Sequence, residues 1–222
     1  MGDIAIGSRE VQPLLRKYRQ PMYDEEKVGN GAATRVISFF SRPRGQTDNA
    51  GVVKTLRDTN LQNANALGGK QEFYLVGFNV MLDWDILATD SMAAAPNALT
   101  NETYVVQQIM ADSLFEFQFG RQTNLVEVPL ERVPFGGGPN GVIHANIVEA
   151  ATSIAQVLTN GVPSVREFYD VRLQKNRPRH IQPDQSFSCQ ITWPRTITLG
   201  TSSGAEWYRI MMYGIGVMLS SM

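Results

Sequence analysis

The chain has 222 residues, of which 43% are hydrophobic and 18% charged, and its formal net charge at pH 7 is −1. A near-neutral chain has no overall attraction for nucleic acid or anionic lipid, so any such contact must come from a local basic segment. Its single cysteine, Cys189, excludes an internal disulfide and a cysteine-based zinc site. The low share of charged residues fits surface that is hidden in an assembly.

The N-terminal sequence has no uninterrupted apolar stretch of the kind that marks a signal peptide. Ile6 stands where myristoylation requires Ser or Thr. Apolar runs are all shorter than the roughly 20 residues that a transmembrane helix needs. We therefore expect a soluble protein that is made in a reducing cytoplasm.

Residues 1–32 predict an N-terminal arm rather than a packed element. Pro13 and Pro21 interrupt any long helix, and basic and acidic residues are mixed along the segment. The glycine-rich step Gly29-Asn30-Gly31 ends the arm. Residues 33–222 are then expected to form a single domain, which is a common size for an all-β sandwich.

The first half of this domain predicts two strands separated by loops. Thr34–Ser41 is rich in β-branched and aromatic residues. Residues 42–70 are dominated by polar and glycine residues, so we expect extended loops with one edge strand at most. In Glu72–Leu87 apolar residues recur at every second position, which predicts a core strand. Its predicted inward face consists of Tyr74, Val76, Phe78, Val80, Leu82, Trp84 and Ile86.

The middle of the chain predicts one helix and one hairpin. A small-residue loop over 88–99 precedes a helix at Asn101–Met110, with Thr100 as its N-cap. Leu114–Phe119 and Asn124–Val133 both alternate and form a hairpin. A glycine-rich loop, PFGGGPNG at 134–141, follows.

The last third returns to strands after a partly helical segment. Val142–Leu158 carries apolar residues at helical spacing, while Ser164–Leu173 fits either a strand or a short helix. Ser186–Leu199 and Trp207–Leu219 are strands. The predicted fold class is all-β with one or two short inserted helices, arranged as a jelly-roll or similar Greek-key sandwich.

No residue pattern predicts catalysis, a cofactor or a metal. Asp83 and Asp85 would project from one strand face about 7 Å apart, near the spacing of a glycosidase pair, but that face is polar and suits solvated charges. The glycines at 136–138 lack the lysine of a phosphate loop. His144 and His180 are the only histidines and form no clustered pair of the kind that cupins use. Cys189 alternates with apolar residues, which predicts a buried small hydrophobe.

Basic residues supply the one candidate contact surface. A cluster near the end of the domain faces only Glu167 and Asp170 as acidic neighbours, and the arm adds further basic residues. Together they would face nucleic acid or a membrane surface, and the alternative is a solvated face or intersubunit ion pairs. The residues are Arg166, Arg172, Lys175, Arg177 and Arg179 in the cluster, and Arg9, Arg16, Lys17 and Arg19 in the arm.

Several segments together resemble the jelly-roll major capsid proteins of tailless icosahedral viruses, especially those that infect bacteria. These are the arm, the strand EFYLVGFNVMLDWDIL, the hairpin FEFQFGRQTNLVEVPLERVPFGGG, and the closing pair FSCQITWP and WYRIMMYGIGVML. The resemblance implies a non-enzymatic virion protein that assembles with identical subunits, as trimers or larger units, into an icosahedral shell. It also implies contacts with other virion proteins, and with the genome or an internal membrane through the basic residues. The arm would become ordered only in the shell.

Two other functions are compatible with the same patterns. A spike, a fibre or a carbohydrate-binding sandwich would need exposed aromatic platforms, for which Trp84, Trp193 and Trp207 are the candidates. A glycoside hydrolase would use Asp83 and Asp85.

Overall fold

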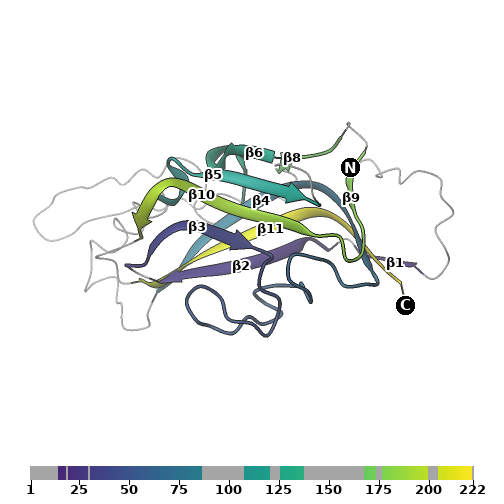
Figure 1. Cartoon of the computed structure of the whole chain (residues 1–222), viewed down its shortest axis with the longest axis horizontal. Helices are drawn as coiled ribbons and strands as arrows, with labels where there is room; N and C mark the ends of the chain where they lie inside the picture. The colour runs from purple at the N-terminus through teal and green to yellow at the C-terminus, as the bar shows by residue number, and fades with distance from the viewer. Residues whose placement is uncertain are drawn as a thin grey trace, which may run out of the picture.

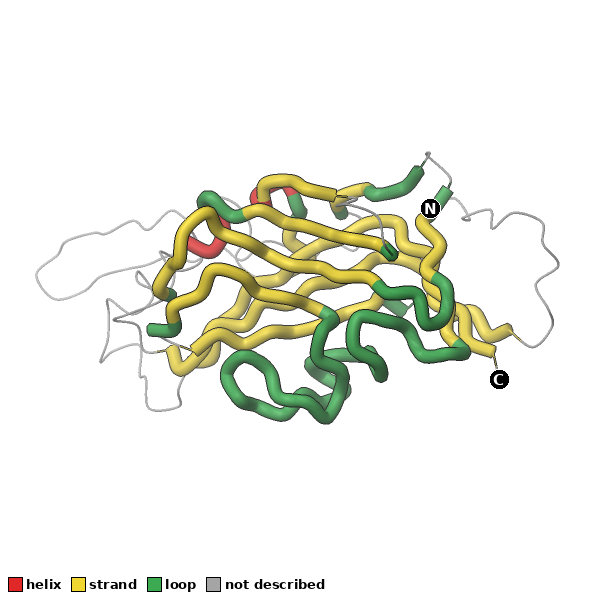
Figure 2. The backbone as a smooth tube through the Cα atoms, viewed as in Figure 1, coloured by secondary structure: helices red, strands yellow, loops and turns green. Residues whose placement is uncertain are grey.

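The computed structural model describes residues 15–18, 20–29, 31–86, 108–120, 126–137, 168–173, 177–199 and 205–221. Strands dominate these residues, and Figures 1 and 2 show them in two stacked layers. Helical structure in the described residues is short: 108–110, which is the described part of the predicted helix, and the 3-10 turn Leu130–Arg132. None of the helices in these ranges is long and apolar enough to cross a membrane.

The larger sheet has β11 (Ala205–Ser221) and β4 (Gln71–Ile86) at its centre. One edge is formed by β1 (Leu15–Tyr18) and β2 (Met22–Gly29), which both pair with β11. Three short strands pair with the other edge of β4, namely β7 (Phe135–Gly137), β8 (Tyr169–Asp170) and β9 (Arg179–Ile181). The smaller sheet has the order β3 (Ala33–Phe39), β10 (Phe187–Thr198), β5 (Leu114–Phe119) and β6 (Val126–Pro129).

The strand pairing follows a jelly roll. Antiparallel pairs join β2 with β11, β3 with β10, β4 with β8 and β9, and β5 with β6. Early strands thus pair with late strands, as in a long antiparallel ribbon that has been rolled into two sheets. The parallel pairing of β7 with β4 departs from this pattern. The predicted all-β jelly-roll or Greek-key sandwich is confirmed.

The prediction that residues 1–32 form an arm rather than a packed element is wrong for residues 22–29, which form β2. Tyr18 pairs with Met218 and Met22 pairs with Gly214, so the step is four residues on both strands (22 − 18 = 4; 218 − 214 = 4). β1 and β2 therefore follow one continuous register along β11, interrupted near Pro21, which has no N–H to donate. The side chains of Met22 and Val28 lie in the core. Residues 1–14 lie outside the described ranges.

Strand β4 is where predicted, but its inward face changes phase. Phe73 and Leu75 are fully buried in the core, whereas Tyr74 is only half-buried; Val76 is buried beside the core cluster. The pairing with β11 shifts by one residue between Ile215 and Gly216. Such a bulge reverses which side chains point inward. The predicted alternation is therefore correct for Phe78, Val80 and Leu82 and wrong for Tyr74.

Gly77 lies where β8 approaches the bulged part of β4. A Cβ placed there would lie 2.3 Å from the Tyr169 carbonyl oxygen and 2.3 Å from Phe168 Cδ2. We expect Gly77→Ala to lower the free energy of unfolding by about 1–3 kcal/mol, because the backbone of β8 must move. Gly29→Ala is the matched control, since a Cβ there meets nothing within 4 Å, and it should change stability by less than about 0.5 kcal/mol. Urea unfolding of both variants tests this, and equal losses would contradict it.

The core fills the space between the two sheets. Phe187, Cys189, Ile191 and Trp193 alternate inward along β10, as the sequence predicts. The predicted hairpin is confirmed by the antiparallel register of β5 with β6. Residues 42–70 form loops with isolated bridges, also as expected. Tyr169–Asp170 is a strand within the ambiguous segment 164–173. The predictions for 88–99, 138–158 and 164–167 lie outside the described residues.

Candidate functional site

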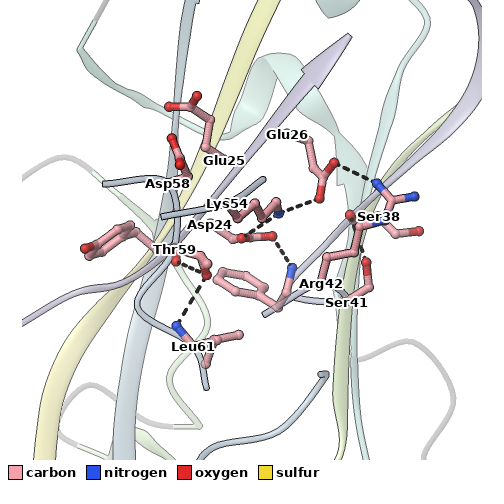
Figure 3. Close-up of polar contacts among 12 residues, drawn as sticks. Asp24, Glu25, Glu26, Ser38, Ser41, Arg42, Lys54, Asp58, Thr59 and Leu61 are labelled. Carbon is pink, nitrogen blue, oxygen red and sulfur yellow. Dashed lines mark hydrogen bonds and ion pairs between the residues drawn. The ribbon is translucent and has the colours of Figure 1, made fainter. Parts of the chain in front are cut away.

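The main polar cluster of the described chain is buried beside β2. Alternation along this strand turns Asp24 and Glu26 toward the loop 42–61, where Lys54 lies between them (Figure 3). The side chains of Asp24 and Glu26 are 0% exposed and that of Lys54 is 1% exposed. Charged groups are almost never fully buried unless they are paired, so the positions of these three groups depend on one another.

The three side chains meet at hydrogen-bond distance. Lys54 Nζ donates to Asp24 Oδ1 at 2.8 Å and to Glu26 Oε1 at 2.6 Å. The backbone N–H of Phe40 donates to Asp24 Oδ2 at 2.6 Å. Glu26 Oε2 accepts from Arg42 Nη1 at 3.0 Å and from the N–H of Asn49 at 3.2 Å. All four carboxylate oxygens therefore have a donor.

Burial raises the pKa of Asp24 to about 6, although the charge and hydrogen bond of Lys54 and the N–H of Phe40 act in the opposite direction. Water is excluded from the site, and the charged form of the carboxyl group is disfavoured there. The neutral acid of Asp24 is thus accessible near neutral pH.

The loop 42–61 is held in place by its own backbone as well. Lys54 donates its N–H to Gln46 O at 2.8 Å and accepts from the N–H of Gly45 at 2.9 Å. Asp58 closes a turn by accepting from the N–H and hydroxyl of Thr55. The N–H of Glu25 then donates to Asp58 O at 2.7 Å, which joins this turn to the edge of β2. The Lys54 backbone is therefore fixed on both sides of its side chain.

A second charged group lies on the opposite face of β2 and is looser. Lys27 Nζ is 3.8 Å from Glu25 Oε1 and 4.0 Å from Asp58 Oδ1, beyond ordinary hydrogen-bond distance. Its ammonium also lies 5.7 Å from the ring centroid of Trp207. Both lysines contact acidic residues of β2, but Lys54 lies within hydrogen-bond distance of its carboxylates and Lys27 does not. Lys27 is therefore a suitable comparison for Lys54.

The predicted basic residues are only partly brought together. Arg172 forms an ion pair with Asp170, and Arg179 Nε donates to Val171 O at 3.0 Å, while Arg177 is exposed. Arg16 and Lys17 lie in β1, at the same end of the larger sheet as β9 but on its opposite edge. The ion pair of Arg172 lies within the chain, so the predicted intersubunit ion pairs stay a prediction. Arg9, Arg19, Arg166 and Lys175 lie outside the described residues.

Three other candidate residues, His180, Trp193 and Cys189, make packing or hydrogen-bond contacts within the fold. His180 stacks on Tyr74, with ring centroids 4.5 Å apart, and its Nε2 is 3.0 Å from Glu72 Oε2. Trp193 is buried and its indole donates to Ile109 O, so it is no exposed platform. Cys189 is fully buried and burial raises its pKa well above the ordinary value, which disfavours a reactive thiolate.

The described residues contain no group of three or more His, Cys, Asp or Glu side chains that could hold a metal ion. Trp207 is half-buried in β11. The backbones of Asp83 and Asp85 lie in β4, while their side chains, that of Trp84, and His144 are outside what the structure describes.

Sequence reasoning missed Asp24, Glu26 and Lys54 because they come from a presumed arm and a presumed surface loop. One local signal was present: the acids in MYDEEKV lie two apart on a strand between Met22 and Val28, so they share the face of two apolar residues. Comparison of the chain with protein-family models, with curated proteins and with solved structures found no match.

Proposed function

We propose that this chain is a structural virion protein, a capsid subunit that assembles with identical copies into an icosahedral shell. The observation that carries the proposal is the jelly-roll pairing of β2 with β11, β3 with β10, β4 with β8 and β9, and β5 with β6. Jelly rolls recur as viral capsid domains, lectin domains and cupins.

The residues on the sandwich favour the first of these three uses. A cupin holds its metal with a cage of histidines, and here His180 stacks on Tyr74 and contacts Glu72 at the surface of β4 and β9. A lectin needs exposed aromatic rings, and Trp193 is in the core. A capsid subunit requires only a stable sandwich with surfaces that fit its neighbours.

The edges of the larger sheet supply one such surface. The outer edge of β2 is covered by its own chain, since Asp24 pairs with Thr59 and the N–H of Asn60 donates to Tyr23 O. The outer edge of β1 has no strand partner in the described part of the chain. An uncovered edge can accept a strand from another molecule, so β1 is where we expect a neighbouring subunit to bind.

Exposed apolar side chains supply further contact area. Among the described residues, Val36, Val53, Leu56 and Leu173 are each about half exposed. Side chains of this kind are buried readily between subunits. Exposed basic residues such as Arg177 would then be available to the genome, an internal membrane or other virion proteins.

Light scattering across a series of protein and salt concentrations tests the proposal. The full chain should form trimers or larger species. A variant lacking residues 1–18 should keep the circular dichroism spectrum of a folded sandwich but should fail to form the largest species, because the β1 edge is gone. A full chain that remains monomeric under every condition would overturn the proposed function and favour a monomeric binding module.

A further inference from the structure

The buried group formed by Asp24, Glu26 and Lys54 contains the components of an amide-forming reaction. We propose that Lys54 Nζ and Asp24 Cγ become joined by an intramolecular isopeptide bond, with Glu26 carrying the proton. This proposal goes beyond the capsid function and does not depend on it, because the reaction needs only the folded chain.

Proximity is the first argument. Lys54 Nζ and Asp24 Oδ1 are 2.8 Å apart, although the two residues are 30 positions apart in sequence. Both side chains are at most 1% exposed, and the Lys54 backbone is fixed by hydrogen bonds to Gly45 and Gln46. Fixed reactants of this kind reach effective concentrations on the order of 10⁵ M or more, which makes a reaction that is negligible in free solution feasible.

The reaction balances without any other reactant. A proton passes from the Lys54 ammonium to the Asp24 carboxylate, which leaves a neutral amine and a neutral acid. The amine lone pair attacks Asp24 Cγ, and Glu26 Oε1 accepts a proton from the nitrogen. Glu26 then returns this proton to the departing hydroxyl group as the C–O bond breaks. One C–N bond forms, one water molecule leaves, Glu26 regains its starting state, and nothing is oxidised or reduced.

The surrounding groups favour each part of this reaction. The Phe40 N–H, 2.6 Å from Asp24 Oδ2, is placed to stabilise negative charge on that oxygen during the attack. Arg42 and the N–H of Asn49 hold Glu26 Oε2, which leaves Oε1 directed at the amine at 2.6 Å. Burial raises the pKa of Asp24 and so favours the acid form that can lose a hydroxyl group.

The product also suits its environment better than the ion pair. Two buried charges carry a large desolvation cost, and a neutral amide removes both. Glu26 and Arg42 remain as a balanced pair. The new bond would join β2 at the sheet edge covalently to the loop 42–61.

Mass spectrometry of the purified, denatured full chain tests the proposal. We expect an intact mass lower by one water molecule than the sequence requires, and a protease digest that yields one branched peptide containing Asp24 and Lys54. The sequence mass, together with a linear peptide containing an unmodified Lys54, would overturn the proposal. The mass gives a clear answer whether the chain is monomeric or assembled. A negative result would therefore overturn the isopeptide bond without bearing on the capsid function.

Two controls test the roles of individual residues. Glu26→Gln removes the proton carrier and should slow bond formation at least about 100-fold, so that the variant keeps the full sequence mass. Bond formation at the wild-type rate in folded Glu26→Gln would overturn the role of Glu26, and if this variant does not fold, the wild-type mass still decides.

Lys27 is an internal control: its contacts with Glu25 and Asp58 are 3.8 and 4.0 Å, so it should remain unmodified. A branched peptide at Lys27 would indicate unspecific dehydration and overturn the site.

Discussion

Replacing Lys54 with methionine should lower the free energy of unfolding by about 3–5 kcal/mol, because it leaves the buried Asp24 carboxyl group without its cation. Asp24 has no other cation within salt-bridge distance in the described residues, and Glu26 keeps only Arg42. Lys54→Met also prevents the proposed isopeptide bond, so the measured loss of stability includes the contribution of that bond. Urea unfolding, followed by circular dichroism, measures the effect.

Arg172→Met is the matched control for this substitution. Arg172 also forms an ion pair with a neighbouring aspartate, but its side chain is 27% exposed and that of Asp170 is 44% exposed. Surface pairs of this kind contribute about 0–1 kcal/mol, so this variant should be nearly as stable as the wild type. Equal losses in the two variants would show that the buried network has no special role in stability.

Replacing Phe78 with alanine should cost about 3–5 kcal/mol, because it removes an aromatic ring that links the two sheets. Phe78 belongs to β4 of the larger sheet and is fully buried. Its ring centroid lies 5.2 Å from that of Phe115 and 4.8 Å from that of Phe117, both on β5 of the smaller sheet. Chemical unfolding monitored by tryptophan fluorescence provides the measurement.

The stability of Tyr74→Ala distinguishes the observed structure of β4 from a strictly alternating strand. Strict alternation along β4 places Tyr74 and Phe78 on the same inward face and predicts similar losses. In the structure Tyr74 is half-buried and stacks on His180, so we expect a loss of only about 0.5–1.5 kcal/mol. Losses of the same size in Tyr74→Ala and Phe78→Ala would contradict the bulge in β4.

The sandwich was predictable wherever a strand keeps a regular period of two. β10 is such a strand: its core residues from Phe187 to Trp193 follow the alternation, because the register with β5 is unbroken there. β4 departs from its pattern at the bulge opposite Ile215 and Gly216, which depends on the partner strand and not on the local sequence. The pairing joins strands far apart in the chain, such as β2 and β11, so the sandwich could be predicted but its strand order could not.

The buried network was not predictable from the sequence for a related reason. Three consecutive acids at 24–26 are typical of a solvated segment, and Lys54 lies in a stretch of polar residues. Each residue taken alone indicates surface. Only the fold brings the ammonium of Lys54 between two carboxylates, because the loop 42–61 folds back along the edge of β2.

A covalent tie and a self-assembling sandwich would support each other mechanically. The uncovered edge of β1 is where we expect a neighbouring subunit to bind, and the proposed bond would anchor β2, the next strand along β11, to the body of its own subunit. Force applied to the edge would then be carried by an amide bond in place of hydrogen bonds alone.

Electron microscopy of the purified full chain at high protein concentration tests the proposed function most directly. We predict closed particles of uniform size, or rings and trimers that are their building units. A field with no species larger than a single sandwich, at every salt concentration at which the protein is folded, would contradict the capsid function.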